Sequence, residues 1–163
     1  MNFKDKYSLE FVQSIKSNVN HEFSVNRFIE NNKDLLISVT SGMNDQNFPL
    51  EQDFEGDVDF IFFKSDRGIY PTNQFVSDAK DDGYILTGVK GIAFLVLKIK
   101  DSPFLPKDIA IFSPNKTFSP EDKNKSLALP YFISRTLGGI ALHHSNDSTT
   151  MIAAENYVVL GRQ

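Results

Sequence analysis

Carboxylates occupy every second position near the start of residues 51–63, EQDFEGDVDFIFF, and these are the residues whose spacing suggests chemistry. Successive side chains of a β-strand point to opposite faces, so residues two apart share a face. The acids that this pattern places on one face are Asp53, Glu55, Asp57 and Asp59. The opposite face is a predicted core face and carries Phe54, Val58, Phe60 and Phe62. Four like charges in a row repel one another unless water screens them or a cation neutralises them.

A metal site is one interpretation of this row. Carboxylate oxygens hold Mg²⁺ or Mn²⁺ in many phosphoryl-transfer sites. Gly56 favours it, because glycine allows a bulge or the close approach of a ligand. The other interpretation is a solvent-exposed strand face, whose charges also oppose edge-to-edge aggregation. We expect no cofactor, with Mg²⁺ or Mn²⁺ on Asp53, Glu55, Asp57 and Asp59 as the alternative.

Two adjacent histidines, His143 and His144, are the candidate acid–base groups. Neighbouring residues on a strand face opposite ways, so the two cannot readily bind one metal ion. One of them would join the carboxylates in the metal-dependent alternative. The simpler interpretation places both histidines at a strand end beside a turn at residues 145–148.

Partner binding is a third possibility, with Phe104, Phe118 and Glu51 as candidate contact residues. The two phenylalanines stand in polar segments, where an aromatic side chain can anchor an interface. They can equally fill the ends of the sheet. The sequence contains no cysteine, which excludes disulfides and thiolate metal sites. It also contains no G-x-S-x-G, Walker or dinucleotide-binding motif.

Helical spacing and capping residues predict helices at residues 9–19 and 24–32. A further short helix after Pro71 would bury Phe75, Val76 and Ala79 and end at Gly83. In the first half of the chain, strands are predicted at residues 35–40 and within residues 51–63. The strongest hairpin signal joins residues 84–89 to residues 92–99 through Lys90 and Gly91.

The second half of the chain reads mainly as strands. We predict them at residues 109–112, 131–137, 140–144, 149–154 and 157–160. Gly138 and Gly139 would turn one hairpin, and a helix over residues 129–142 is the competing interpretation. The polar segment at residues 113–126 is a predicted mobile surface loop.

These elements predict a single α+β domain over residues 1–163. Its helical part covers residues 1–33, so two N-terminal helices precede the sheet. A mostly antiparallel, curled or barrel-like β-sheet covers residues 34–163. The length, the 40% hydrophobic content and the fifteen phenylalanines suit a sizeable core.

The net charge is −4, and residues 51–59 contain five acids and no base, so the acidity is local. We predict no nucleic-acid binding, because no basic stripe is present. A polar N-terminus and an apolar run of only residues 91–97 predict a soluble cytoplasmic protein, or a part of a particle assembled in the cytoplasm. No membrane association is expected, and the oligomeric state is open.

We therefore expect a small non-enzymatic interaction protein that presents an acidic face to a partner protein with a basic surface. A phage or virion component, or an inhibitor or immunity protein, would fit this expectation. The alternative is a divalent-metal-dependent enzyme that acts on phosphodiester or nucleotide substrates through the carboxylate row. Asp57 and Asp59 would be its principal ligands, and His143 or His144 its acid–base group.

Overall fold

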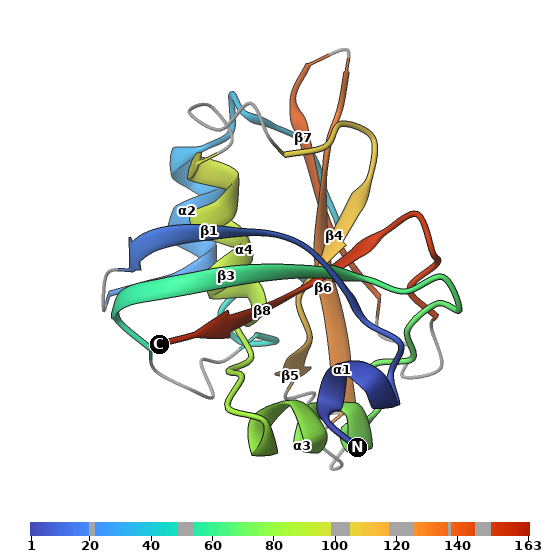
Figure 1. The fold of residues 1–163 in the computed structure, drawn as a ribbon. Helices are drawn as coiled ribbons and strands as arrows, with labels where there is room; N and C mark the ends of the chain where they lie inside the picture. The colour runs from blue at the N-terminus through green and yellow to red at the C-terminus, as the bar shows by residue number, and fades with distance from the viewer. Residues whose placement is uncertain (20–21, 49–53, 99–104, 118–125, 137, 146–150) are drawn as a thin grey trace.

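An open mixed β-sheet with helices on both faces forms the protein (Figure 1). The computed structural model describes residues 1–19, 22–48, 54–98, 105–117, 126–136, 138–145 and 151–163. Within these residues the strands are β1 (Glu10–Val19), β2 (Leu36–Val39), β3 (Gly56–Lys64), β4 (Ala110–Phe112), β5 (Asn115–Thr117), β6 (Ser126–Ser134), β7 (Ile140–Ser145) and β8 (Tyr157–Arg162). The helices of the same residues are α1 (Phe3–Lys6), α2 (Val25–Asn31), α3 (Asn73–Asp81) and α4 (Gly88–Lys98).

The strands lie in the order β1-β3-β8-β4-β6-β7-β2, and β5 pairs with β6 outside this path. Most neighbours are antiparallel, but β4 pairs with β8 and β2 with β7 in parallel. The sheet is therefore mixed. The predicted barrel-like closure is wrong, because β1 and β2 are the two ends of the path and each pairs with one strand. The α+β expectation holds only in the coarser sense of a domain built from both helices and a sheet.

Two hydrophobic cores lie on opposite faces of this sheet. One contains side chains of α2 and α4, and the other contains side chains of α1 and α3. Strand β3 contributes to both cores, with Phe60 and Phe62 on the α4 face and Phe63 on the α3 face. A strand that is covered on both faces must be apolar on both, which explains the run of hydrophobic residues in its second half.

The helix predicted at residues 9–19 is wrong, because this segment is the edge strand β1. Its apolar residues follow helical spacing, yet Val12 and Ile15 pack against the same core from a strand. The pairing with β3 shifts between Phe11 and Gln13, and such a bulge lets residues three apart face the same way. The predicted helical part of the chain is residues 1–33. Among its described residues the helices are α1 and α2, and the strand β1 lies between them in the chain.

The hairpin predicted at residues 84–99 is also wrong, because residues 88–98 form α4. A helix buried on nearly all sides is a continuous apolar run, which periodicity cannot distinguish from a central strand. Gly91, the supposed turn residue, lies inside the helix. A Cβ atom there would lie 3.1 Å from Phe60 Cε1 and 2.3 Å from Thr87 Cβ, so glycine permits the close packing of α4 on β3.

The two remaining helix predictions are confirmed. Ser24 caps α2 and accepts a hydrogen bond from the backbone N–H of Arg27 at 3.2 Å. Helix α3 buries Phe75, Val76 and Ala79, as its spacing predicts. Gly83 follows the α3 C-cap with a φ of +82°, the left-handed conformation that ends many helices.

The hairpin predicted around Gly138 and Gly139 is confirmed, although β6 ends at Ser134 and not at residue 137. The competing helix over residues 129–142 is wrong. Strands β6 and β7 pair antiparallel, from Leu129 with Ser145 to Ser134 with Ile140. Of the predicted loop at residues 113–126, residues 115–117 form β5, and residues 118–125 lie outside the described residues. Strands β2, β4 and β8 confirm their predictions to within two residues. Among the described helices, none has the length and apolar character that crossing a bilayer requires.

Candidate functional site

Asp57 and Asp59 lie on one face of β3, near the strand's first residue. The core face is confirmed, since Phe54, Val58, Phe60 and Phe62 are buried in one cluster. The row of four acids on one strand is not, because β3 begins at Gly56, whose φ of +79° breaks the alternation. Glu55 therefore precedes the strand, and Asp53 lies outside the described residues.

Basic and amide side chains flank this pair of carboxylates from both neighbouring strands. Asp57 pairs with Asn18 of β1, whose Nδ2 donates a hydrogen bond of 3.0 Å to Asp57 Oδ1. Asp59 pairs with Lys16 on one side and with Arg162 on the other. Lys16, Asp59 and Arg162 thus form a line of alternating charge across three strands.

A solvent-open hollow of about 460 Å³ surrounds this line, and we call it the polar hollow. It is lined by Lys16, Ser17, Asn18, Asp57, Val58, Asp59, Lys98, Arg162 and Gln163. Asp57 is exposed and Asp59 is half-buried. The hollow contains two acids and three bases, so this described part of the predicted acidic face has mixed charge.

The C-terminal end of β8 is anchored around the hollow by two hydrogen bonds. Arg162 Nη2 donates to the carbonyl oxygen of Asp82 at 3.1 Å, and its guanidinium lies 4.4 Å from the centre of the Tyr84 ring. Burial raises the pKa of Tyr84, and the charge of Arg162 opposes that shift. Gln163 Nε2 donates to the carbonyl oxygen of Glu55 at 2.8 Å. These contacts join the end of β8 to the segment that follows α3 and to the residue that precedes β3.

Lys90 of α4 binds the backbone just before β3 from the core side of the sheet. Its side chain is 1% exposed, and its Nζ donates a hydrogen bond of 2.7 Å to the carbonyl oxygen of Phe54. The ammonium also lies 4.8 Å from the centre of the Phe54 ring, within the range of a cation–π interaction. The segment just before Asp57 is thereby fixed to the helix layer.

The histidines lie on β7 and face opposite ways, as predicted. His143 Nε2 lies 2.8 Å from Ser38 Oγ, and His144 Nε2 donates to the carbonyl oxygen of Ser41 at 3.2 Å. The His144 ring packs edge-on against Phe48 of the α4-side core. Strands β8, β4 and β6 lie between β3 and β7, a separation of about 19 Å along a sheet with strands about 4.8 Å apart. The structure does not bring the histidines together with the carboxylates.

The remaining site candidates keep the status of predictions. Glu51, Asp53, Phe104 and Phe118 lie outside the described residues. Across the described ranges, no three histidine or acidic side chains come together in a group that could hold a metal ion.

The sequence offers no local signal for the other residues of the hollow. The sequence predicts a helix at Lys16 and a hairpin at Lys98, while Arg162 and Gln163 follow a predicted strand whose partner the sequence does not give. The pairing of β3 with β1 and β8 brings Lys16 and Arg162 beside the carboxylates, and Gln163 follows β8. The position of α4 brings Lys98 to the same hollow.

Comparisons of this chain with protein-family models, curated proteins and solved structures found no match in any of the three.

Proposed function

We propose that this chain is a non-enzymatic interaction protein that binds a segment of a partner protein in the polar hollow. The observation that carries the proposal is the line of alternating charge from Lys16 through Asp59 to Arg162 inside a concave surface. Complementary charge patterns set the register of two surfaces and disfavour wrong partners, since like charges placed opposite each other are costly.

The partner segment must carry charges of both signs. The sequence alone favours a basic partner, because it shows the acids of residues 51–59 without their neighbours. In the folded chain Lys16, Lys98 and Arg162 line the same hollow as Asp57 and Asp59. A purely basic segment would meet three positive side chains there. A segment that alternates basic and acidic side chains meets opposite charges at each step.

The position of the histidines supports binding over acid–base catalysis at these carboxylates. A general acid or base must lie within hydrogen-bond reach of the reacting group, directly or through one water molecule. His143 and His144 are four strand positions away from β3. The His143 ring instead contacts Tyr131 of the neighbouring strand β6. The His144 ring contacts Phe48, which follows β2 in the chain.

A metal-dependent enzyme is the second candidate, and one observation favours it. Magnesium in proteins is commonly held by one or two carboxylates together with substrate phosphates. Asp57 and Asp59 are two such carboxylates, and Lys16 and Arg162 beside Asp59 suit phosphate groups. A Mg²⁺–nucleotide would then occupy the polar hollow.

Backbone amide NMR of the whole chain separates the two proposals. The probes are a peptide of alternating Lys and Glu, tetralysine, tetraglutamate, and ATP with Mg²⁺. We expect the alternating peptide to shift the amides of Lys16, Asn18, Asp59 and Arg162, with binding that weakens as salt screens the charges. The variant Asp59→Asn should lose these shifts, and Asp81→Asn on the exposed side of α3 should keep them.

Other outcomes would change the conclusion. Shifts with Mg²⁺ and ATP, and none with the alternating peptide, would replace the interaction proposal by the nucleotide enzyme. Stronger binding of tetralysine than of the alternating peptide would restore the purely basic partner. The absence of shifts with all four probes would overturn a binding role for the hollow.

A further inference from the structure

A second, smaller hollow lies between α2 and α4, and we call it the apolar groove. It has a volume of about 240 Å³ and is lined in part by Phe23, Phe28, Phe94 and Leu97. The Phe23 ring lies 6.4 Å from the Phe28 ring and 6.5 Å from the Phe94 ring, measured between centroids. Leu97 is 46% exposed, so part of this large apolar side chain is open to solvent beside the aromatic cluster.

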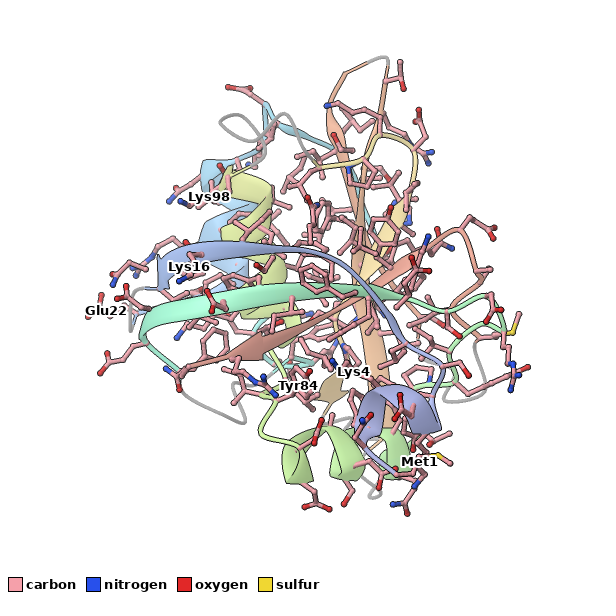
Figure 2. All side chains as sticks on the ribbon, in the orientation of Figure 1. Met1, Lys4, Lys16, Glu22, Tyr84 and Lys98 are labelled. Carbon is pink, nitrogen blue, oxygen red and sulfur yellow. The ribbon has the colours of Figure 1, made fainter. Side chains whose placement is uncertain are left out.

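The apolar groove and the polar hollow meet at the last turn of α4. Leu97 lines the groove, and the next residue, Lys98, lines the hollow. Lys16, which also lines the hollow, and Glu22, which lines the groove, lie on the same side of the molecule as Lys98 in the view of Figure 2. A single bound segment that crosses the end of α4 would therefore reach both.

We infer that the apolar groove takes one large apolar side chain, such as Phe or Leu, of the same partner segment whose charged residues lie in the polar hollow. This inference rests on the proposed function and adds an anchor to it. Protein interfaces commonly place an apolar or aromatic anchor in a pocket and surround it with polar contacts. Here the groove supplies the pocket and the hollow supplies the charged surroundings.

The size and the charges of the groove favour a side chain over a free small molecule. Small-molecule sites usually measure about 300–1,000 Å³, and the groove is smaller than that range. Glu22 and Arg27 are exposed and also line the groove, so opposite charges continue beside it. A partner segment with an apolar residue next to charges of both signs fits both features.

Two fluorescent peptides test the inference on the whole chain. Both carry the alternating Lys and Glu sequence and a short Gly-Ser linker, and one ends in Phe where the other ends in Ser. We expect the Phe peptide to bind roughly tenfold more tightly, the gain that burial of one large apolar side chain can supply. Leu97→Ser should remove this gain and leave the Ser peptide unaffected. Ile37→Ser, at an exposed isoleucine on β2, is the matched control and should change neither affinity.

Each alternative outcome is distinguishable. Equal affinities of the two peptides, with the amides of Lys16 and Asp59 still shifted, would overturn the anchor and leave the proposed function intact. Failure of both peptides to bind would overturn the proposed function as well. If a Phe-Gly-Ser peptide without charges bound as tightly as the charged Phe peptide, the groove would be a site separate from the polar hollow. A dimer in sedimentation that Leu97→Ser abolishes would assign the groove to a second copy of the chain.

Discussion

Lys90 Nζ lies 2.7 Å from the carbonyl oxygen of Phe54, inside the core and one residue before Glu55. This hydrogen bond joins α4 to the segment that immediately precedes β3 and its carboxylates, Asp57 and Asp59. A buried lysine is uncommon, because its ammonium must be compensated by acceptors. The carbonyl of Phe54 is one such acceptor, so a buried charge positions the start of the candidate site.

Replacing Lys90 by Met should destabilise the protein by about 1–3 kcal/mol, because the carbonyl oxygen of Phe54 loses a charged donor in the core. The free energy of unfolding from urea titration measures the loss. Lys80→Met, at an exposed lysine of α3, is the control and should stay within about 0.5 kcal/mol of the native chain. Equal stability of the two variants would contradict a structural role for Lys90.

Asp45 reaches the N-terminus of α2 from the turn after β2. Its carboxylate accepts hydrogen bonds from Ser24 Oγ and from the backbone N–H of Val25, both at 2.6 Å. We expect Asp45→Ala to cost about 0.5–2 kcal/mol, the usual range for loss of a helix cap. Thermal or urea unfolding measures it, with the exposed Asp34→Ala as control. A loss no larger than that of the control would show that Ser24 alone caps the helix.

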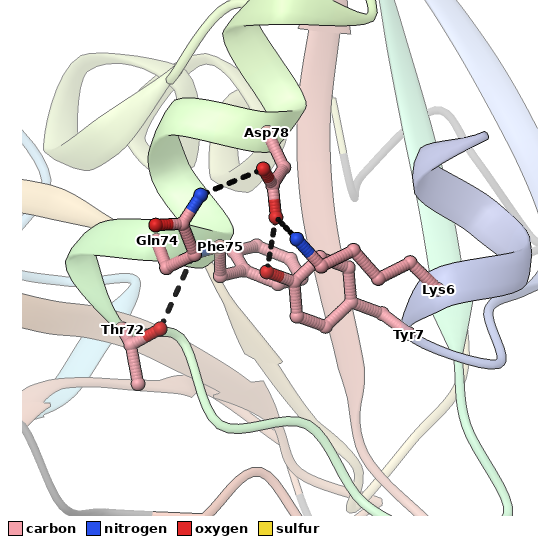
Figure 3. Close-up of polar contacts among 6 residues, drawn as sticks. All are labelled: Lys6, Tyr7, Thr72, Gln74, Phe75 and Asp78. Carbon is pink, nitrogen blue, oxygen red and sulfur yellow. Dashed lines mark hydrogen bonds and ion pairs between the residues drawn. The ribbon is translucent and has the colours of Figure 1, made fainter. Parts of the chain in front are cut away.

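Helix α1 is joined to α3 through the carboxylate of Asp78 (Figure 3). Lys6 Nζ lies 2.6 Å from Asp78 Oδ2, Tyr7 Oη donates to the same oxygen at 2.5 Å, and Gln74 Nε2 donates to Oδ1 at 2.8 Å. These three donors lower the pKa of Asp78 from 3.8 to about 2, and the hydrogen bond from Lys6 has the largest effect. Desolvation of the half-buried Tyr7 phenol, together with its hydrogen bond to Asp78, raises the pKa of Tyr7.

The stability of the protein should therefore depend on the charge of Asp78 in acid. Because the folded-state pKa lies below the unfolded value, the contribution is complete above about pH 4 and is lost as the pH falls toward 2. We expect Asp78→Asn to unfold more easily than the native chain at pH 7, with a difference that shrinks between pH 4 and pH 2. Urea titration at a series of pH values measures it. Asp81→Asn is the control, and a constant difference across this range would refute the prediction.

Gly91 allows α4 to pack closely on β3. Alanine favours an isolated helix over glycine by about 1 kcal/mol. Gly91→Ala should nevertheless destabilise the protein by about 1–3 kcal/mol, because the new Cβ would press against Thr87 and the Phe60 ring. Ser77→Ala, at an exposed position of α3, controls for the helix preference and should be neutral or stabilising. A stabilised Gly91→Ala variant, measured by urea unfolding, would contradict this packing.

The correct sequence predictions depended on signals that act within a few residues. Ser24 identifies the start of α2, because a cap bonds to an N–H three residues away. Gly83 identifies the end of α3, and Gly138 and Gly139 identify the turn from β6 to β7, because glycine adopts positive φ at low cost. The buried face of β3 follows from the alternation of Val58, Phe60 and Phe62 within the strand.

The wrong predictions came from apolar patterns that suit two structures. Residues 9–19 follow helical spacing because a bulge in β1 lets residues three apart share a face. Within residues 84–99, the run at residues 91–97 is continuously apolar, which suits a central strand and a buried helix equally. Tertiary packing decides between the two structures in both cases. Residues 10–19 pair with β3 at the edge of the sheet as β1, and residues 88–98 cover one face of the sheet as α4.

The candidate site divides in the same way. The sequence by itself determined that Asp57 and Asp59 share a face opposite a phenylalanine-rich core, because strand alternation is a local property of the backbone. Only the tertiary structure decided that Lys16, Lys98 and Arg162 surround them, and that His143 and His144 do not. The physical reason is that strand order is set by the burial of both sheet faces together, which joins residues far apart in the chain and leaves no mark in local spacing.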